Sequence, residues 1–237
     1  MELGGHPAIA TRPRGAFALY VLAHGAGAGM RHPFMAALAD ALAERRVATV
    51  RWEFPYMAAG KTRPDRPPVA EAAVREVWDA IDDPLPRFAG GKSFGGRMTV
   101  RAHAAAPLAD LAGLIFLGFP LHPPEKPGPK MERGGFTPPR GIERAEHLAI
   151  APGPMLFLQG TRDAFAQPQL LRPAIAALGD RATLHEVAHA DHGFDVLVRS
   201  GRTHDEVIAE LANVIASWME ARIAACGRAT RRGTRRS

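Results

Sequence analysis

Gly91-Lys92-Ser93-Phe94-Gly95 matches the pattern G-x-S-x-G and joins a strand-like segment, residues 87–91, to a segment with helical spacing, residues 94–106. A strand-to-helix turn this sharp holds the serine in a strained backbone conformation, and side chains at the flanking glycine positions would collide with neighbouring elements. The serine hydroxyl then stands at the carboxyl edge of a sheet, beside a helix N-terminus whose dipole favours negative charge. The pattern predicts that Ser93 is a nucleophile; the alternative is a helix N-cap serine.

Strand-like apolar runs alternate with helical patterns outward from this motif in both directions. The other expected strands are residues 16–24, 47–54, 112–119, 155–159 and 183–187, and the other expected helices are residues 33–45, 69–81 and 205–225. Continuous apolar runs are typical of strands in a sheet that is covered on both faces. The alternation predicts an α/β fold in a single domain, with a mainly parallel sheet of about six strands and helices on both faces.

The length and composition of the chain are those of a globular protein without disulfides or membrane spans. The chain has 237 residues, of which 46% are hydrophobic, so it is long enough for one globular domain and is not disordered over most of its length. Its single cysteine, Cys226, excludes an intramolecular disulfide framework and a multi-cysteine zinc site. No apolar stretch approaches the roughly 20 residues of a membrane span, and the N-terminus has no signal-peptide pattern. We therefore expect a cytoplasmic protein with no membrane partner.

The formal net charge of +6 comes from the C-terminus. Residues 221–237 hold six arginines and no acidic residue, so the rest of the chain is neutral. This basic segment has no interleaved aromatic residues, and nucleic-acid binding is therefore not expected. We expect residues 1–225 to form the domain and residues 226–237 to form a basic, disordered tail.

A proline-rich segment interrupts the alternation of strands and helices. Residues 120–139 carry seven prolines, which exclude a regular helix or strand. A structureless loop of this length within a compact domain is usually functional or disordered. We expect it to form a short lid.

Two other motifs could in principle form the functional site instead of the serine motif. His185-Glu186-Val187-Ala188-His189 matches the zinc pattern H-E-x-x-H, which needs both histidines on one face of a helix and a third ligand downstream. This segment is strand-like, so we expect no metal, although Glu206 or Glu210 could serve as the distant ligand. A phosphate-binding loop ending in Gly91-Lys92-Ser93 would need another glycine five residues before its last glycine, where the chain has proline.

The serine motif predicts two further residues. In folds with this serine turn, an acid and then a histidine follow the nucleophile along the chain. Asp163 lies just after one expected strand, and His192 lies in a glycine-bounded loop after the next. We therefore expect His192 to be the general base and Asp163 to be its acidic partner. The nearest alternatives are His189 for the base, and Asp191 and Asp195 for the acid.

The loop after the first expected strand consists of small residues, His24-Gly25-Ala26-Gly27-Ala28-Gly29. Small residues let backbone N–H groups approach an oxyanion closely. We expect the backbone N–H groups of Ala26 and Phe94 to form this oxyanion hole.

Three apolar side chains follow the carboxyl end of the next expected strand, where ligands bind in open α/β sheets. We expect Phe54, Tyr56 and Met57 to line the substrate pocket, with plain core packing as the alternative. Lys92 precedes the serine, and we expect it to face away and pair with a carboxylate rather than to attract an anionic substrate.

Six motifs, HGAGAGM, RWEFPYM, GGKSFGGRM, GLIFLGFPL, LQGTRDAF and ADHGFD, resemble in this order those of small α/β-hydrolases, whose bacterial members are often described as dienelactone-hydrolase-like. The resemblance covers roughly residues 16–220. It extends to the hydrolase-like domain of testis-expressed proteins and of a regulatory subunit of the non-specific lethal histone acetyltransferase complex. It implies an α/β-hydrolase fold. In comparison with the larger hydrolases, we expect this chain to lack the first antiparallel strands and a helical cap of the usual size.

Residues and resemblance together predict a serine hydrolase. It would cleave a carboxylic ester or thioester of a small-molecule acyl substrate through an acyl-enzyme intermediate, with no cofactor and no metal. The alternative is a catalytically weak hydrolase-fold scaffold for protein interaction. The complete set of Ser93, Asp163 and His192 favours the enzyme, and the lack of an evident acyl pocket favours the scaffold.

Overall fold

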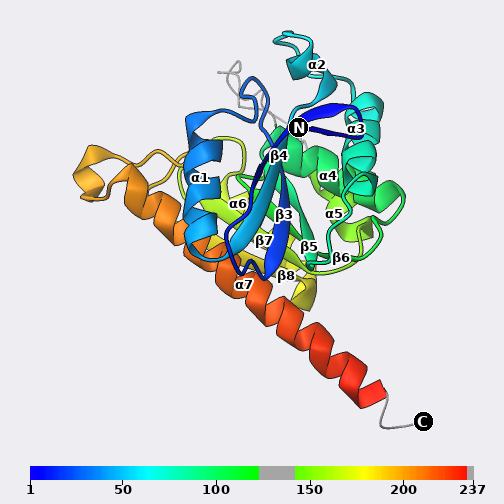
Figure 1. Ribbon diagram of the computed structural model, residues 1–237. Helices are drawn as coiled ribbons and strands as arrows, with labels where there is room; N and C mark the ends of the chain where they lie inside the picture. Colours follow the sequence, from blue (N-terminus) through cyan, green and yellow to red (C-terminus); the bar gives the residue numbers. More distant parts are fainter. Residues whose placement is uncertain (123–141, 234–237) are drawn as a thin grey trace.

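The computed structural model describes residues 1–122 and 142–233 (Figure 1). Most of the expected lid, residues 120–139, lies outside the described residues, and so do residues 234–237 of the expected tail.

The described residues form a single sheet of eight strands. The strands are β1 (Glu2–Leu3), β2 (His6–Thr11), β3 (Ala18–Ala23), β4 (Val47–Trp52), β5 (Arg87–Lys92), β6 (Leu111–Leu117), β7 (Met155–Gly160) and β8 (Ala182–Val187). Their order is β1-β2-β4-β3-β5-β6-β7-β8, and β3 to β8 run parallel. The predicted α/β class and mainly parallel sheet are confirmed, and the six expected strands are β3 to β8.

The two N-terminal strands correct the expectation that the first antiparallel strands are absent. β2 pairs antiparallel with β4, and β1 pairs antiparallel with β2. The sequence of β2, His-Pro-Ala-Ile-Ala-Thr, contains proline and alanine, which are weak strand formers, so its strand signal is faint. Pairing with β4 and burial of His6 and Ala8 hold this segment in the sheet.

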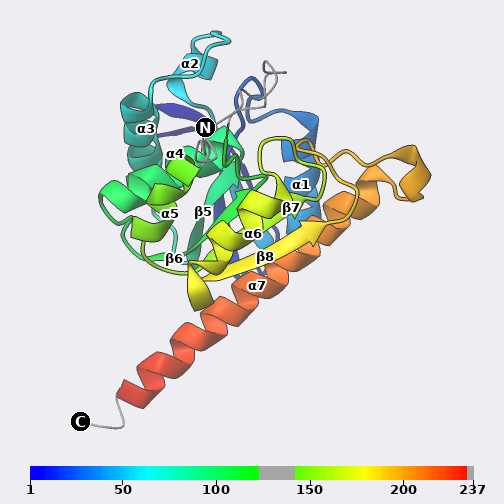
Figure 2. The ribbon, with the colours of Figure 1, turned by 180° about the vertical axis from the view of Figure 1, so that it is seen from behind.

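Helices cover both faces of the sheet, as expected (Figures 1 and 2). One face carries α1 (Pro33–Glu44) and α7 (His204–Gly233), whose apolar side chains form one buried cluster with the sheet. The other face carries α3 (Pro67–Asp79), α4 (Phe94–Ala105), α5 (Glu146–Ile150) and α6 (Pro168–Ala176) around a second cluster. A further short helix, α2 (Pro55–Ala58), lies in the segment after β4.

The last helix is longer than expected. α7 continues through Cys226 to Gly233, so residues 226–233 of the expected disordered tail are helical. Three of these eight residues are arginine, which has high helix propensity, whereas two are glycine, which does not favour a helix. At about 1.5 Å per residue, the helix is roughly 45 Å long, and its C-terminal part extends beyond the sheet (Figures 1 and 2).

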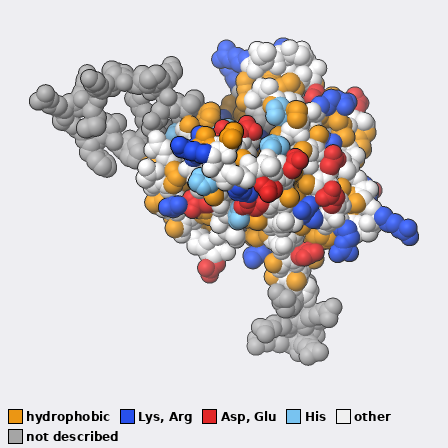
Figure 3. Space-filling model, turned by 90° about the vertical axis from the view of Figure 1, so that its left-hand side faces the viewer, with side chains coloured by type: hydrophobic (Ala, Val, Ile, Leu, Met, Phe, Trp, Pro, Cys, Tyr) orange, Lys and Arg blue, Asp and Glu red, His pale blue; other side chains and the backbone are white. Residues whose placement is uncertain are grey.

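The surface is charged and mixed on the face that Figure 3 presents, where acidic and basic side chains are interspersed. Within the described residues, no helix combines the length and the apolar character that crossing a membrane requires.

The strand order places a crevice at the carboxyl ends of β3 and β5. From β3 the chain proceeds to β4 on one side, and β5 then returns to the other side of β3. This reversal is the switch point at which open α/β sheets bind their ligands. Ser93 lies directly after β5 with φ at +48°, in the left-handed region that side chains rarely adopt.

The glycines around Ser93 have the steric role expected from the sequence. A Cβ atom on Gly91, whose φ is +149°, would lie 2.1 Å from the carbonyl oxygen of Ala23 in β3. A Cβ atom on Gly95 would lie 2.6 Å from the carbonyl oxygens of Ala23 and His24. The turn and the first turn of α4 therefore pack against the backbone of β3 with no space for side chains.

Replacing Gly91 by alanine should lower the free energy of unfolding by about 3 kcal/mol or more, because a backbone clash adds to the strain of a positive φ. Gly15→Ala is the matched control, since Gly15 also has a positive φ, of +70°, but nothing lies within 4 Å of its Cβ position. That control should lose only about 1 kcal/mol. Urea denaturation measures both variants, and equal losses would contradict the steric role of Gly91.

Candidate active site

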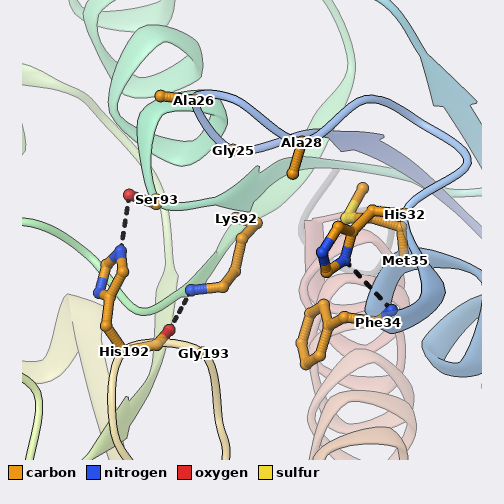
Figure 4. A pocket seen from close by; sticks show the side chains of 10 residues that line it. All are labelled: Gly25, Ala26, Ala28, His32, Phe34, Met35, Lys92, Ser93, His192 and Gly193. Carbon is orange, nitrogen blue, oxygen red and sulfur yellow. Dashed lines mark hydrogen bonds between the residues drawn. The ribbon is translucent and has the colours of Figure 1, made fainter.

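Ser93 directs its hydroxyl group toward a histidine rather than toward its own helix. It occupies the N-cap position of α4, but its side chain makes no capping hydrogen bond. Instead, Ser93 Oγ lies 2.9 Å from His192 Nε2 (Figure 4). The positive φ of Ser93 is what turns the hydroxyl away from the helix and into the crevice.

His192 lies in the loop after β8, and Asp191 shapes this loop. Asp191 Oδ1 accepts hydrogen bonds from the N–H groups of Gly193, at 2.8 Å, and Asp195, at 3.1 Å. The N–H group of Asp191 donates in turn to the carbonyl oxygen of Asp195 at 3.0 Å. Asp191 is thus occupied in the backbone of the loop, which leaves His192 at its tip beside Ser93.

Asp163 holds the other nitrogen of the imidazole. His192 Nδ1 lies 2.7 Å from Asp163 Oδ2, and the Asp163 side chain is fully buried. A carboxylate only accepts hydrogen bonds, so Nδ1 carries the proton and Nε2 is free to accept the hydrogen of the Ser93 hydroxyl. The structure thus brings Ser93, His192 and Asp163 into one chain of hydrogen bonds. The rivals Asp191 and Asp195 are not in this chain.

A second set of contacts fixes the carboxylate of Asp163. Its Oδ1 accepts from the N–H group of Phe165 at 2.7 Å, and its Oδ2 accepts from the side-chain amide of Gln159. Gln159 Oε1 accepts from the N–H group of Phe119 at 2.9 Å, which ties Asp163 to the end of β6. Gln159 was not identified from the sequence, although a polar residue in an apolar strand is a signal that could have found it.

Two neighbours restrict the position of the imidazole. The ring of Phe165 lies over that of His192, with centroids 4.3 Å apart and planes inclined by 33°. On another side lies Gly118, with φ at +66°, where a Cβ atom would be 3.4 Å from His192 Nδ1 and 3.5 Å from Asp163 Oδ2. A glycine at this position lets the imidazole and the carboxylate pack directly on the backbone.

Lys92 faces the site, contrary to the expectation that it faces away. Its Nζ donates a hydrogen bond to the carbonyl oxygen of His192 (Figure 4) and lies 5.2 Å from the centre of the Phe194 ring. Burial lowers the pKa of the Lys92 ammonium group to about 8, against the opposing effect of nearby carboxylates, of which Asp163 is the strongest. Lys92 therefore connects the end of β5 to the loop that carries His192.

The loop after β3 is fixed by His24. His24 Nδ1 lies 2.8 Å from the carbonyl oxygen of Gly25, and His24 Nε2 accepts from the N–H group of Phe54 at 3.1 Å. The ring is therefore neutral, with its proton on Nδ1, and burial lowers its pKa in agreement with this state. Ala26, two residues further on, lies beside Ser93 (Figure 4). Phe94 is the first residue of α4, so its N–H group has no acceptor within the helix.

Two cavities meet at Ser93 and Ala26, which line both. The first, the lysine-side cavity, has a volume of about 190 Å³ and is shown in Figure 4. Its other lining residues are Gly25, Ala28, His32, Phe34, Met35, Lys92, His192 and Gly193. The second, the arginine-side cavity, has a volume of about 300 Å³. Its other lining residues are Pro64, Asp65, Phe94, Arg97, Pro120, Arg144 and Phe165.

The aromatic residues expected in the substrate pocket lie elsewhere. Phe54 and Tyr56 are buried and line neither cavity. Their rings pack against Phe94, with centroids 5.1 Å and 6.3 Å from its own, so they support the first residue of α4 from the core. Met57 also lines neither cavity. The core-packing alternative therefore describes Phe54 and Tyr56, because the chain turns into α2 directly after β4.

The H-E-x-x-H segment does not form a helix. His185 and Glu186 belong to strand β8, and His189 lies in the turn after it, so the two histidines do not share a helical face. His185 Nε2 instead lies 2.6 Å from Glu210 Oε1 on α7. Among the described residues, no group of three or more histidine, cysteine, aspartate or glutamate side chains is placed to hold a metal ion.

Solved structures with the same fold include several bacterial proteins. A dienelactone hydrolase from Anabaena variabilis is 17% identical, with a TM-score of 0.66 and 90% of each chain covered. An α/β serine hydrolase without lid from Xanthomonas campestris is 20% identical, with a TM-score of 0.63, over 89% of this chain and 88% of that one. Est1E from Butyrivibrio proteoclasticus, solved with ferulic acid bound, is 17% identical, with a TM-score of 0.66, over 94% and 98%.

The family is shown by sequence as well as by fold. The family model described as an alpha/beta hydrolase domain matches residues 16–220, which comprise β3 to β8 and most of α7. The matched region contains the turn at Ser93 and the loops that carry Asp163 and His192. The chain therefore belongs to the alpha/beta hydrolase domain family.

Proposed function

We propose that this protein is a serine hydrolase that cleaves a carboxylic ester or thioester through an acyl-enzyme intermediate. The observation that carries the proposal is the chain of hydrogen bonds from Asp163 through His192 to Ser93, with Ser93 at the junction of two cavities. Nucleophile, base and orienting acid lie within hydrogen-bond reach of one another, as acyl transfer requires.

The reaction would proceed in two displacements. Ser93 Oγ attacks the acyl carbon while its proton moves to His192 Nε2, and a tetrahedral oxyanion forms. The bond from the acyl carbon to the leaving oxygen or sulfur then breaks, and His192 returns the proton to the leaving group. Water repeats the sequence on the acyl-serine and releases the acid. Asp163 stabilises the imidazolium in both displacements and fixes the tautomer.

The oxyanion would be held by backbone groups. Ala26 and Phe94 line the arginine-side cavity together with Ser93, which supports this assignment, and the N-terminal end of the α4 dipole adds positive potential there. A well-placed donor of this kind contributes about 3 kcal/mol of transition-state stabilisation. These donors belong to the backbone, so the small residues of the loop after β3 matter through the conformation that they allow.

The two cavities suggest how an ester is divided across the site. A scissile carbonyl group at Ser93 has one part of the molecule on each side, and the cavities of about 190 Å³ and 300 Å³ extend in two directions from Ser93. Their size suits a substrate with small or medium substituents rather than a long chain or a macromolecule.

Lys92 is a positioning residue in this proposal. Its hydrogen bond to the carbonyl oxygen of His192 holds the loop that carries the imidazole. Because Lys92 directly precedes Ser93, this bond also connects that loop to the nucleophile. The ammonium group thus sets the distance between base and nucleophile without contacting the reacting atoms.

Purified protein should react covalently with a fluorophosphonate probe, and Ser93→Ala should not. Asp163→Asn should react about 10³- to 10⁴-fold more slowly, because the amide cannot stabilise the imidazolium. Asp195→Asn is the matched control, since Asp195 is the rival acid with an exposed side chain, and it should react at the wild-type rate. Labelling rates followed by gel fluorescence measure all four proteins.

Two outcomes would overturn the proposal. Labelling that persists in Ser93→Ala would place the reactive group elsewhere. A folded wild-type protein that neither reacts with the probe nor hydrolyses any ester of a panel would favour the non-catalytic scaffold.

The buried ammonium group predicts a pH-dependent stability. Lys92 loses its proton near pH 8 in the folded protein and near pH 10.5 in the unfolded chain, so between these values the unfolded chain binds more protons. The free energy of unfolding of the wild type should therefore rise with pH relative to Lys92→Met, by up to about 1.4 kcal/mol per pH unit. Urea denaturation at pH 7.5 and 9.5 measures the difference.

Lys61→Met serves as the control for this measurement, because Lys61 is exposed, and its stability profile should run parallel to that of the wild type. Lys92→Met should also lose about tenfold in kcat with little change in KM, since His192 loses one support. A Lys92→Met profile that is parallel to the wild type would show that the ammonium group is not desolvated.

A further inference from the structure

Arg97 lies one helical turn beyond the proposed nucleophile. Its N–H group donates to the carbonyl oxygen of Ser93 at 3.1 Å, so the two residues are on the same face of α4. Its side chain lines the arginine-side cavity, together with Ser93 and the two expected oxyanion donors. A charged group is thereby built into the wall of the cavity in which the reaction would occur.

The Arg97 guanidinium group has no counter-ion among the described residues. It makes no side-chain hydrogen bond or salt bridge there, whereas Arg101, one turn further along α4, is paired with Glu71. Burial and, to a smaller extent, the positive charges of Arg144 and Arg101 lower the pKa of Arg97 to about 10. A half-buried cation that is surrounded by like charge is stabilised when an anion binds beside it.

Arg144 contributes a second guanidinium group to the same cavity. It lies in the short 3-10 helix Ile142–Ala145, and its charge acts on Arg97. Among the described residues, the lining of this cavity has one carboxylate, that of Asp65, whose Oδ2 accepts from the N–H group of Tyr56 at 2.9 Å. Within the described part of the lining, positive groups thus outnumber negative ones.

We propose that the arginine-side cavity binds a carboxylate carried by the substrate, with Arg97 as its principal partner. This inference rests on the proposed function and narrows its substrate class to esters or thioesters that bear a free carboxylate on one side of the scissile bond. A guanidinium group presents parallel N–H donors that match the two oxygens of a carboxylate. The distance of one helical turn between Ser93 and Arg97 leaves the carboxylate a few bonds away from the reacting carbonyl group.

Matched ester pairs test the proposal with the full-length protein. One pair, 4-nitrophenyl hydrogen glutarate and 4-nitrophenyl methyl glutarate, differs only in a charge on the acyl side. The other, 4-carboxyphenyl butanoate and its methyl ester, differs only in a charge on the leaving group. In at least one pair, wild type should prefer the anionic ester, and Arg97→Met should reduce that preference about 10- to 100-fold in kcat/KM. The kcat/KM for the anionic esters should fall by more than the kcat/KM for the neutral esters.

Arg101→Met is the matched control, because it removes an arginine of the same helix that is paired outside the cavity. It should keep the wild-type preference, and Arg97→Lys should restore part of it. If Arg97→Met leaves the ratio of anionic to neutral rates unchanged in both pairs, the carboxylate site is refuted while the hydrolase proposal stands.

A binding measurement keeps the inference testable without turnover. Calorimetry with Ser93→Ala should show that monomethyl glutarate binds more tightly than dimethyl glutarate, and the added change Arg97→Met should weaken the binding of the monoester at least tenfold. Equal binding within this pair, and equal binding of 4-carboxyphenyl butanoate and its methyl ester, would together overturn the carboxylate site. Loss of all esterase activity and probe labelling, with this binding preference intact, would instead overturn the hydrolase proposal alone.

Discussion

The absence of space for side chains at the turn between β5 and α4 is the constraint on which the rest of the site depends. Gly91 and Gly95 pack against the backbone of β3 at distances that no Cβ atom could occupy. This contact forces Ser93 into a positive φ and sets the start of α4 beside the loop after β3. The hydroxyl group, the first N–H group of the helix and, one turn later, Arg97 all take their places from that one approach of two backbones.

The position of the His192 imidazole is fixed by residues that lie at or just after the ends of several strands. Asp163 is fixed by Gln159 and by the backbone of Phe165, and Gln159 is fixed in turn by the N–H group of Phe119. Lys92 ties the histidine loop back to β5. Both oxygens of the buried Asp163 carboxyl group accept hydrogen bonds, which offsets the cost of burying them.

The sequence predicted the mainly parallel sheet and the positions of Ser93, Asp163 and His192 just after their strands. These features could be predicted because apolar runs mark the strands, and the residues that follow each run mark the strand ends. Strand β2 escaped prediction because its sequence has weak propensity and only its pairing with β4 makes it a strand. Phe54 and Tyr56 were expected in the pocket, since nothing in the pattern shows that the chain turns inward after β4. The directions of the Lys92 and Arg97 side chains depend on packing, which residue spacing does not predict. The interval of four residues between Ser93 and Arg97 could nevertheless have shown that both lie on one face of the helix.

The conformation of Ser93 has a consequence for how this protein can change over time. A residue other than glycine in this backbone region costs about 1 to 3 kcal/mol of folding free energy, and glycine would relieve that strain. Glycine at this position would therefore remove both the strain and the hydroxyl group, whereas alanine would remove the hydroxyl group and keep the strain. Serine at this position lowers the stability of the fold, so the fold itself does not require it. Its presence there is explained by the reaction that we propose.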